Sequence, residues 1–320
     1  MAILVTGVAG FIGAAVARAL LDCGETVVGI DNLNADYAVT LKRARLAQLV
    51  SPSFVFVEAD FADPAALAAV ASTHAFDRIV HLGAQAGVRH SLDAPGEYVR
   101  SNLVGHANIL ELARARGCPH LVYASSSSVY GSNGKLPFAV GDTVDHPVSL
   151  YAATKRSGEL MSDAYAHLFQ LPQTGLRFFT VYGPWGRPDM APWLFTEAVL
   201  RGEPIRLNNG GRMSRDFTWI DDVVAGVLAA LDRPPRGTRP HQLYKLGTDR
   251  AEALLRFVQL IEAATGKRAI VEDAPLPPGD VIATHADIDS ARADLGYDPR
   301  VTLDDGLPRF VAWFREYSGL

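Results

Sequence analysis

The sequence predicts an α/β protein built around a doubly wound parallel sheet, and three observations support this. Short apolar runs rich in β-branched residues alternate with helical patterns over residues 1–179. These runs are nearly continuous in hydrophobic residues, as in strands that helices cover on both faces. A glycine triplet (Gly7, Gly10 and Gly13) stands between the first apolar run and the first helical pattern.

Six strands are expected: Ala2–Val5, Val27–Asp31, Phe54–Ala59, Arg78–Leu82, Leu121–Ser125 and Gly175–Phe179. Helices are expected between them over residues 11–22, 64–73, 97–116 and 150–169. Asp63 followed by Pro64 is typical of a helix start, with a capping carboxylate and then a proline in the first turn. Right-handed crossovers bring the carboxyl ends of all the strands to one edge of a Rossmann-type sheet, where ligands bind.

The composition changes after about residue 180. Proline and glycine become frequent, and helical patterns over residues 191–201, 221–231, 251–264 and 303–317 are mixed with short strands. We therefore expect a Rossmann domain over residues 1–179 and a smaller α/β substrate domain over residues 180–320. Segments of the second are expected to interleave with the first.

Composition narrows the classes of function. The chain has 320 residues, of which 48% are hydrophobic and 20% charged, so it can form a large core. The net charge is −5 and no Lys/Arg run exceeds two residues, so neither nucleic acid nor an anionic membrane is an expected partner. No apolar run has membrane-spanning length, and the N-terminus enters a strand without the basic segment of an export signal.

The cysteines and histidines indicate no disulfide and no metal. Cys23 and Cys118 are expected to be free thiols in a reducing cytoplasm. The nine histidines include no pair at ligand spacing, so no metal site is expected.

The segment "TGVAGFIG" predicts a dinucleotide-binding loop. Its glycines allow the backbone to approach a pyrophosphate, whose charge then meets the free N–H groups at the start of a helix. Asp31 ends the second strand, where a carboxylate can accept a hydrogen bond from a ribose 2′-OH and would repel a 2′-phosphate. This favours NAD over NADP. The alternative is a structural turn with an ordinary surface aspartate.

Tyr151 and Lys155 are one helical turn apart, and they follow the four serines Ser125–Ser128 at the end of the fifth strand. A phenol with its ordinary pKa of about 10 is a poor base near neutral pH. A neighbouring ammonium and the charge of oxidised nicotinamide would lower that pKa, and a serine could align the phenol with a substrate hydroxyl. The pair alone could be a coincidence of spacing.

Together these features resemble the extended short-chain dehydrogenase/reductase family, and more narrowly the bacterial UDP-glucuronate 4-epimerases. The closer resemblance rests on "GIDNLNADY" with "LKRARL", "HLGAQAGVRHSL", "SNLVGHANILE", "ASSSSVYG", "DHPVSLYAATK", "TGLRFFTVYGPWGRPDMAP" and "MSRDFTWIDD". These segments span nearly the whole chain.

The resemblance implies a set of site residues. Tyr151 would be the base, Lys155 would lower its pKa and bind the nicotinamide ribose, and Ser126, four residues before the tyrosine of "VYG", would be the catalytic hydroxyl. The NAD site would consist of Gly7, Gly10, Phe11, Ile12, Gly13, Asp31, Asn32, Asp60, Phe61, Leu82, Ala84, Gln85 and Asn102, together with Tyr151 and Lys155. Arg215 resembles an arginine that binds the substrate diphosphate, whereas Pro277 stands where many relatives have a second one.

The serine run bears on the reaction. Related 4,6-dehydratases and UDP-glucuronate decarboxylases resemble this chain but carry acids before "VYG", where this chain has Ser126-Ser127-Ser128. The missing acid favours simple C4 epimerisation of a UDP-sugar, with the hydride returned to a tightly bound NAD. A uronate substrate would become a β-keto acid, so an epimerase must hold its carboxylate. We hypothesise that Ser127, Ser128, Thr180 and Arg187 do so; the alternative for Arg187 is a salt bridge with Asp189.

The alternatives to a UDP-glucuronate 4-epimerase are a 4-epimerase of neutral UDP-sugars, a UDP-glucuronate decarboxylase, and, from a different class, a non-catalytic NAD-sensing protein. The retained Tyr151, Lys155 and Ser126 argue against the last. The helices over 97–116 and 150–169 carry apolar residues beyond one stripe. In the resembling family these helices pair across a two-fold axis, so a homodimer is expected.

Overall fold

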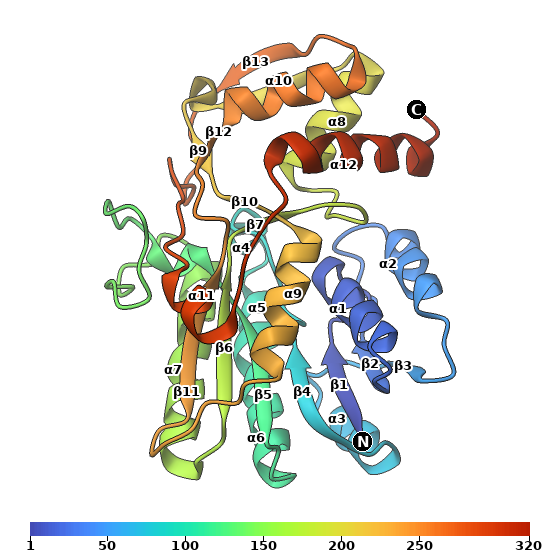
Figure 1. The fold of residues 1–320 in the computed structure, drawn as a ribbon, viewed down its shortest axis with the longest axis vertical. Helices are drawn as coiled ribbons and strands as arrows, with labels where there is room; N and C mark the ends of the chain where they lie inside the picture. The colour runs from blue at the N-terminus through green and yellow to red at the C-terminus, as the bar shows by residue number, and fades with distance from the viewer.

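A seven-stranded parallel sheet forms the centre of the computed structural model, which describes residues 1–320 (Figure 1). Its strand order is β11-β6-β5-β4-β1-β2-β3, with every pair parallel. The strands are β1 (Ala2–Thr6), β2 (Val27–Asp31), β3 (Phe54–Glu58), β4 (Phe76–His81), β5 (His120–Ser126), β6 (Gln173–Phe178) and β11 (His241–Leu246). This confirms the Rossmann-type fold class.

Helices cover both faces of the sheet, as the continuous apolar runs predict. Every residue of β1 is buried, with Ile3 and Val5 in one hydrophobic cluster and Ala2 and Leu4 in a second on the opposite face. The surrounding helices are α1 (Phe11–Asp22), α2 (Val39–Leu46), α3 (Pro64–Thr73), α6 (His106–Ala115), α7 (Leu150–Phe169) and α9 (Ile220–Leu231). Helices α1 and α9 pack together on one face, and α6 contacts α3 and α7 on the other.

Two features differ from the sequence expectation. The sheet has a seventh strand, β11, so residues 241–246 return to it from beyond residue 180. The single helix expected over 97–116 is instead α5 (Pro95–Tyr98), a π-helix over Val99–Gly105, and α6, after the short α4 (His90–Asp93). At Gly105 a Cβ would lie 2.4 Å from the Phe61 ring, so the chain passes this aromatic side chain at very close range.

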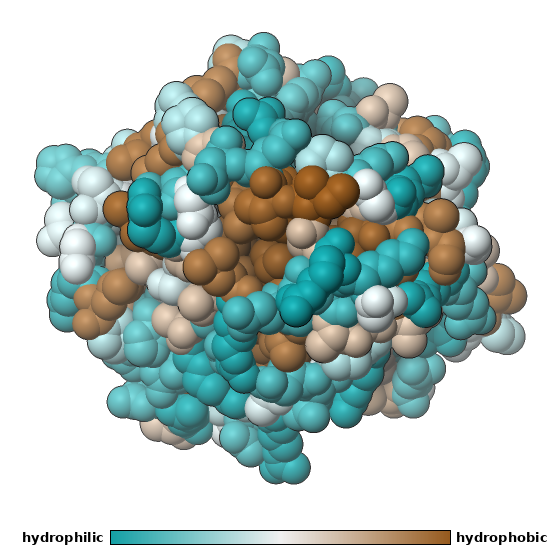
Figure 2. All heavy atoms as spheres, turned by 90° about the horizontal axis from the view of Figure 1, so that it is seen from above, coloured by the Kyte–Doolittle hydropathy of each residue, from teal (hydrophilic) through white to brown (hydrophobic).

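Most of the remaining elements form a lobe above the sheet edge in Figure 1. It contains α8 (Ala191–Arg201), α10 (Leu254–Thr265) and α12 (Leu303–Ser318), whereas α11 (Asp289–Leu295) packs beside the sheet against α9 and β11. The paired short strands are β7 (Thr180–Tyr182) with β10 (Phe217–Trp219), β8 (Pro204–Asn208) with β13 (Ile270–Ala274), and β9 (Ser214–Arg215) with β12 (Glu252–Ala253). Seen from above, hydrophobic atoms gather in the middle of this face within a largely hydrophilic border (Figure 2). None of the helices is both long and apolar enough to cross a bilayer.

Candidate active site

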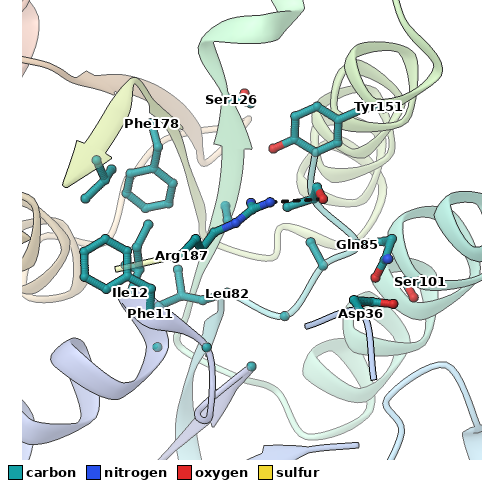
Figure 3. Close-up of a pocket in the computed structure, with 18 of the residues that line it drawn as sticks. Phe11, Ile12, Asp36, Leu82, Gln85, Ser101, Ser126, Tyr151, Phe178 and Arg187 are labelled. Atoms are coloured by element: carbon teal, nitrogen blue, oxygen red, sulfur yellow. Dashed lines mark hydrogen bonds between the residues drawn. The ribbon is translucent and has the colours of Figure 1, made fainter. Parts of the chain in front are cut away.

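A cavity of about 400 Å³ opens where the carboxyl ends of the central strands meet the upper lobe. It brings together most of the residues predicted from the sequence. Those that line it are Gly7, Gly10, Phe11, Ile12, Gly13, Asp31, Asn32, Phe61, Leu82, Ala84, Gln85, Ser126, Tyr151, Lys155 and Arg187. Figure 3 shows Tyr151 and Ser126 on one side of this cavity, Phe11 and Ile12 on another, and Arg187 projecting between them.

The glycine loop fits a dinucleotide. Gly7 has φ +69°, and a Cβ on Gly13 would lie 2.1 Å from the carbonyl oxygen of Gly7, so side chains at these positions would close the turn. Helix α1 begins at Phe11 without a side-chain cap. Its first N–H groups are therefore free to bind an anion such as a pyrophosphate.

Asp31 is a buried carboxylate held at the wall of the cavity. Its Oδ1 accepts from the Leu33 N–H at 2.9 Å and its Oδ2 from the Ala9 N–H at 3.2 Å. Burial raises its pKa, while these two hydrogen bonds and the nearby Lys42 charge act in the opposite direction. The remaining lone pairs suit the ribose hydroxyls of NAD.

Two predicted cofactor residues do not line the cavity. Asp60 accepts from the Ala62 N–H and pairs with Arg100 at 2.8 Å. Asn102 is buried and exchanges two hydrogen bonds with the backbone of Gln85, accepting at 2.8 Å and donating at 2.9 Å. Asn102 thus orients Gln85, which does line the cavity; direct cofactor contacts of Asp60 and Asn102 stay predictions.

The three predicted catalytic residues converge from two elements. Ser126 ends β5, and Tyr151 and Lys155 occupy successive turns of α7, whose N-cap Ser149 accepts from the Ala152 N–H at 3.1 Å. Lys155 Nζ donates to the Ala124 carbonyl at 2.9 Å, which fixes the ammonium beside the strand end. Because Tyr151 and Lys155 are four residues apart on one helix, both side chains reach the cavity that Ser126 also lines.

Burial dominates the titration of both ionisable members. It raises the pKa of the Tyr151 phenol, although a hydrogen bond with Ser126 and the positive charge of Arg187 act to lower it. It lowers the pKa of Lys155 to about 8, against the charge of Glu159. The residues of the chain on their own therefore keep the phenol protonated near neutral pH.

Arg187 lies in the cavity but already has a carboxylate partner. Its Nε donates to Asp189 Oδ1 at 3.0 Å, and its Nη2 donates to Asp189 Oδ2 at 2.5 Å and to the Ala86 carbonyl at 3.3 Å. The structure thus contains the Arg187–Asp189 salt bridge, the alternative to a carboxylate-binding role for Arg187. Nη1 is not used in these bonds.

The other predicted substrate residues surround a second, smaller cavity of about 110 Å³. They are Ser127, Ser128, Thr180 and Arg215. Ser126 connects the two cavities, because its Oγ lies 3.1 Å from Ser128 Oγ. Arg215 forms an ion pair with Asp280 at 2.8 Å and donates to the carbonyls of Val281 and Ile282, close to Pro277 in sequence.

Sequence reasoning missed several cavity residues. Tyr37 and Lys42 line the wall beside Asp31; both lie in segments that carry the family resemblance, "GIDNLNADY" and "LKRARL", but neither was predicted as a site residue. Asp36, His90 and Glu97 bring ligand atoms within 4.8 Å of one another, although their sequence spacing gives no sign of it. All three are exposed, so this grouping carries no metal assignment.

The fold and the site define a Rossmann-type enzyme in which a phenol, an ammonium and a hydroxyl stand beside a dinucleotide-binding loop. The model of the NAD dependent epimerase/dehydratase family matches residues 3–247. The chain belongs to this family, and its cofactor is NAD.

Named relatives share nearly the whole chain. A probable UDP-glucuronate 4-epimerase of Rhizobium meliloti is 46% identical over 330 residues, covering 98% of this chain and 97% of the relative. UDP-glucuronate 4-epimerase 1 of Arabidopsis thaliana is 44% identical over 333 residues, covering 100% of this chain and 78% of the relative.

Solved structures agree on the fold. The UDP-glucuronic acid 4-epimerase of Bacillus cereus, in complex with UDP-glucuronic acid and NAD, is 33% identical with a TM-score of 0.89, covering 99% of this chain and 100% of that one. A UDP-glucose 4-epimerase of Thermotoga maritima reaches the same TM-score at 30% identity and the same coverage. Fold similarity alone therefore does not separate acidic from neutral sugars.

Proposed function

We propose that the protein interconverts UDP-glucuronate and UDP-galacturonate by epimerisation at C4. The observation that carries this proposal is the composition of the site. A phenol, an ammonium and a serine hydroxyl stand together, and no carboxylic acid occupies the serine run that precedes Val129-Tyr130-Gly131. The relatives named for UDP-glucuronate support the choice of substrate.

Each residue of the constellation has a distinct task. NAD, when bound, takes up and returns the hydride and contributes a positive charge in its oxidised form. Ser126 hydrogen-bonds the substrate hydroxyl and holds it in line with the phenol of Tyr151. Tyr151 takes the proton from the 4-hydroxyl oxygen and gives it back after the sugar has turned over. Lys155, fixed by the Ala124 carbonyl, stabilises the phenolate charge.

The carboxylate of the uronate needs a partner because the 4-keto sugar is a β-keto acid. Arg187 shares the cavity with Tyr151 and provides the positive charge. A bound carboxylate would use the free Nη1 or replace Asp189 on the guanidinium fork. Ser127, Ser128 and Thr180 would add neutral donors from the adjoining cavity.

Arg187→Ala tests this role. We expect its KM for UDP-glucuronate to rise at least about tenfold, which corresponds to about 1.4 kcal/mol of lost binding, with a larger share of products that have lost carbon dioxide. The matched control is Arg201→Ala, which removes an arginine on α8 that also pairs with a nearby acid, Glu197. Unchanged turnover of the uronate by Arg187→Ala would show that Arg187 does not bind the substrate carboxylate.

The substrate itself is tested by incubating the purified protein with UDP-glucuronate, without added NAD, and following products by proton NMR. UDP-galacturonate rising to a fixed ratio is the expected result. A UDP-pentose with carbon dioxide would instead support a decarboxylase. Turnover of UDP-glucose alone would support a neutral-sugar epimerase, in line with the structural similarity to the Thermotoga maritima enzyme. No turnover of any nucleotide sugar would favour the NAD-sensing alternative.

We further propose that two copies of the chain associate through the π-helix, α6 and α7. Exposed apolar residues on the π-helix and on α7 support this: Val99, Val104, Leu160, Leu168 and Phe169. Light scattering of the purified protein would measure its molar mass and so distinguish one chain from two.

The two unpaired cysteines, Cys23 and Cys118, support the cytoplasm as the site of action.

A further inference from the structure

Arg45, on α2, is a buried arginine without an acidic partner. Its side chain is among the largest that are fully buried, with the residue 1% exposed. The guanidinium makes its hydrogen bonds only to neutral oxygens. It donates to the carbonyls of Trp185 (3.0 Å from Nε and 2.7 Å from Nη2), Gly186 (2.9 Å) and Ala9 (3.2 Å), and to the Tyr37 hydroxyl (2.6 Å).

The carbonyl acceptors belong to two loops that both contribute residues to the lining of the active-site cavity. Ala9 lies within the glycine loop, between Gly7 and Gly10. Trp185 and Gly186 directly precede Arg187. A single guanidinium therefore joins the backbone of the cofactor loop to the backbone of the segment that carries the proposed carboxylate-binding arginine.

The backbone at Trp185 is strained where Arg45 holds it. Trp185 has φ +65°, a left-handed conformation that a bulky residue rarely adopts. Its indole packs against Trp313 and Tyr317, with ring centroids 5.3 and 5.4 Å away, and its carbonyl accepts twice from Arg45. Such strain persists only where the surroundings determine the conformation, and it is typical of functional sites.

Burying a charged group is costly unless it is fully hydrogen-bonded. Burial lowers the pKa of Arg45, and the nearby positive charge of Arg187 acts in the same direction. An apolar side chain would fill the same space without this cost. The arginine is therefore best explained by the loops that its donors hold together.

We propose that Arg45 is a positioning residue for the reaction, which fixes the loop of residues 183–190 against the glycine loop and so sets where Arg187 stands in the cavity. Arg45 lines a cavity behind the active site and does not line the active-site cavity itself. Its effect on the substrate rests on the proposed function, because it acts through the carboxylate partner Arg187.

The test compares Arg45→Met and Arg45→Lys with the wild type. Methionine keeps much of the volume without donors, whereas lysine keeps the charge but cannot reach both loops with one planar fork. The matched control is Arg43→Met, an exposed position on the same helix. Hydrogen exchange of the purified protein is measured first, since the Gly186 and Met190 amides donate to carbonyls within the 183–190 loop and report its order. The kcat, KM and products with UDP-glucuronate are measured second.

We expect exchange in residues 183–190 to be at least about tenfold faster in Arg45→Met, with a smaller effect in Arg45→Lys and none in Arg43→Met. The KM should rise about tenfold, kcat should change less, and the share of decarboxylated product should grow. Unchanged exchange in this loop, or exchange that accelerates uniformly over the chain with unchanged KM and products, would overturn the proposal. If Arg45→Met does not fold, the exchange rates of residues 183–190 in Arg45→Lys decide whether Arg45 orders this loop. If the wild type does not act on UDP-glucuronate, the exchange data alone decide the role of Arg45, and only the substrate proposal fails.

Discussion

Glu159 and Arg177 form a two-point ion pair inside the molecule, with Nε 2.7 Å from Oε1, Nη2 2.8 Å from Oε2 and both side chains 1% exposed. Ser125 donates to the same Glu159 Oε1 at 2.6 Å. The pair thus links α7, which carries Tyr151, to β6 and to the end of β5, where the serines begin. It therefore ties together the elements that carry the proposed catalytic residues Ser126 and Tyr151.

Replacing Glu159 by Gln should destabilise the protein by about 3–5 kcal/mol, because it leaves the Arg177 guanidinium buried without its counter-charge. Urea denaturation measures this change. The control is Glu111→Gln, which breaks an exposed pair with Arg114 and should cost less than about 1 kcal/mol. Equal midpoints for the wild type and Glu159→Gln would show that the pair adds nothing to stability.

Lys155 should give the stability a characteristic pH dependence. Burial lowers its folded-state pKa to about 8 from its ordinary value of 10.5, so the unfolded chain binds more protons between these two pH values. The free energy of unfolding of the NAD-free wild type should therefore rise with pH in this window, relative to Lys155→Met, by at most about 3 kcal/mol. Denaturation curves at pH 7.5, 9 and 10.5 measure it. If the difference in unfolding free energy between the wild type and Lys155→Met did not change with pH, the Lys155 ammonium would not have a lowered pKa in the folded state.

Sequence patterns could predict much of the fold because its signals are local. Helices over 11–22, 64–73, 150–169 and 191–201 match the structure residue for residue, since caps, prolines and apolar periodicity mark their ends. The strand β11 and the π-helix were not predicted. The first is separated from its neighbour in the sheet by many residues, and the second has no signal in hydrophobic periodicity.

In the site, too, some residues could be predicted from the sequence and others could not. Tyr151 and Lys155 were predictable as residues of the cavity from their helical spacing only together with their place after the serine run and the family resemblance, and Asp31 from its place at a strand end. Arg45 and Glu159 were not, because their roles depend on partners such as Trp185 and Arg177 that only the folded chain brings near. Likewise, no local pattern could indicate that Ser128 and Thr180 surround a different cavity from Arg187.

Tyr151→Phe should lower kcat about 10²–10⁴-fold, because it removes the group that moves the proton at the 4-hydroxyl. The ring can keep its edge contact with Tyr98, at 6.1 Å between centroids, so the fold should persist. NAD released on denaturation is measured beside the rate and should be unchanged. Tyr165→Phe, on the same helix, is the control. An active Tyr151→Phe would remove the phenol from the mechanism.

A carboxylate introduced into the serine run should repel the carboxylate of a uronate substrate. Ser128→Glu should reduce kcat/KM for UDP-glucuronate at least about tenfold more than Ser128→Gln, which has the same shape without the charge. The difference between the two variants should be smaller with UDP-glucose, because its sugar carries no carboxylate. Initial rates for both sugars with both variants give the comparison. Equal losses for Glu and Gln would mean that the serines are needed for their size and not for their neutrality.

In the proposed epimerisation, a hydride leaves C4 and returns to the opposite face of the same sugar. The most direct test is to incubate UDP-glucuronate carrying deuterium at C4 with the purified protein and no added NAD. The expected product is UDP-galacturonate that retains its deuterium at C4, as read by NMR and mass spectrometry. UDP-galacturonate with ordinary hydrogen at C4 would rule out this hydride path, because the C4 hydrogen would then have come from solvent instead of being returned as the same hydride.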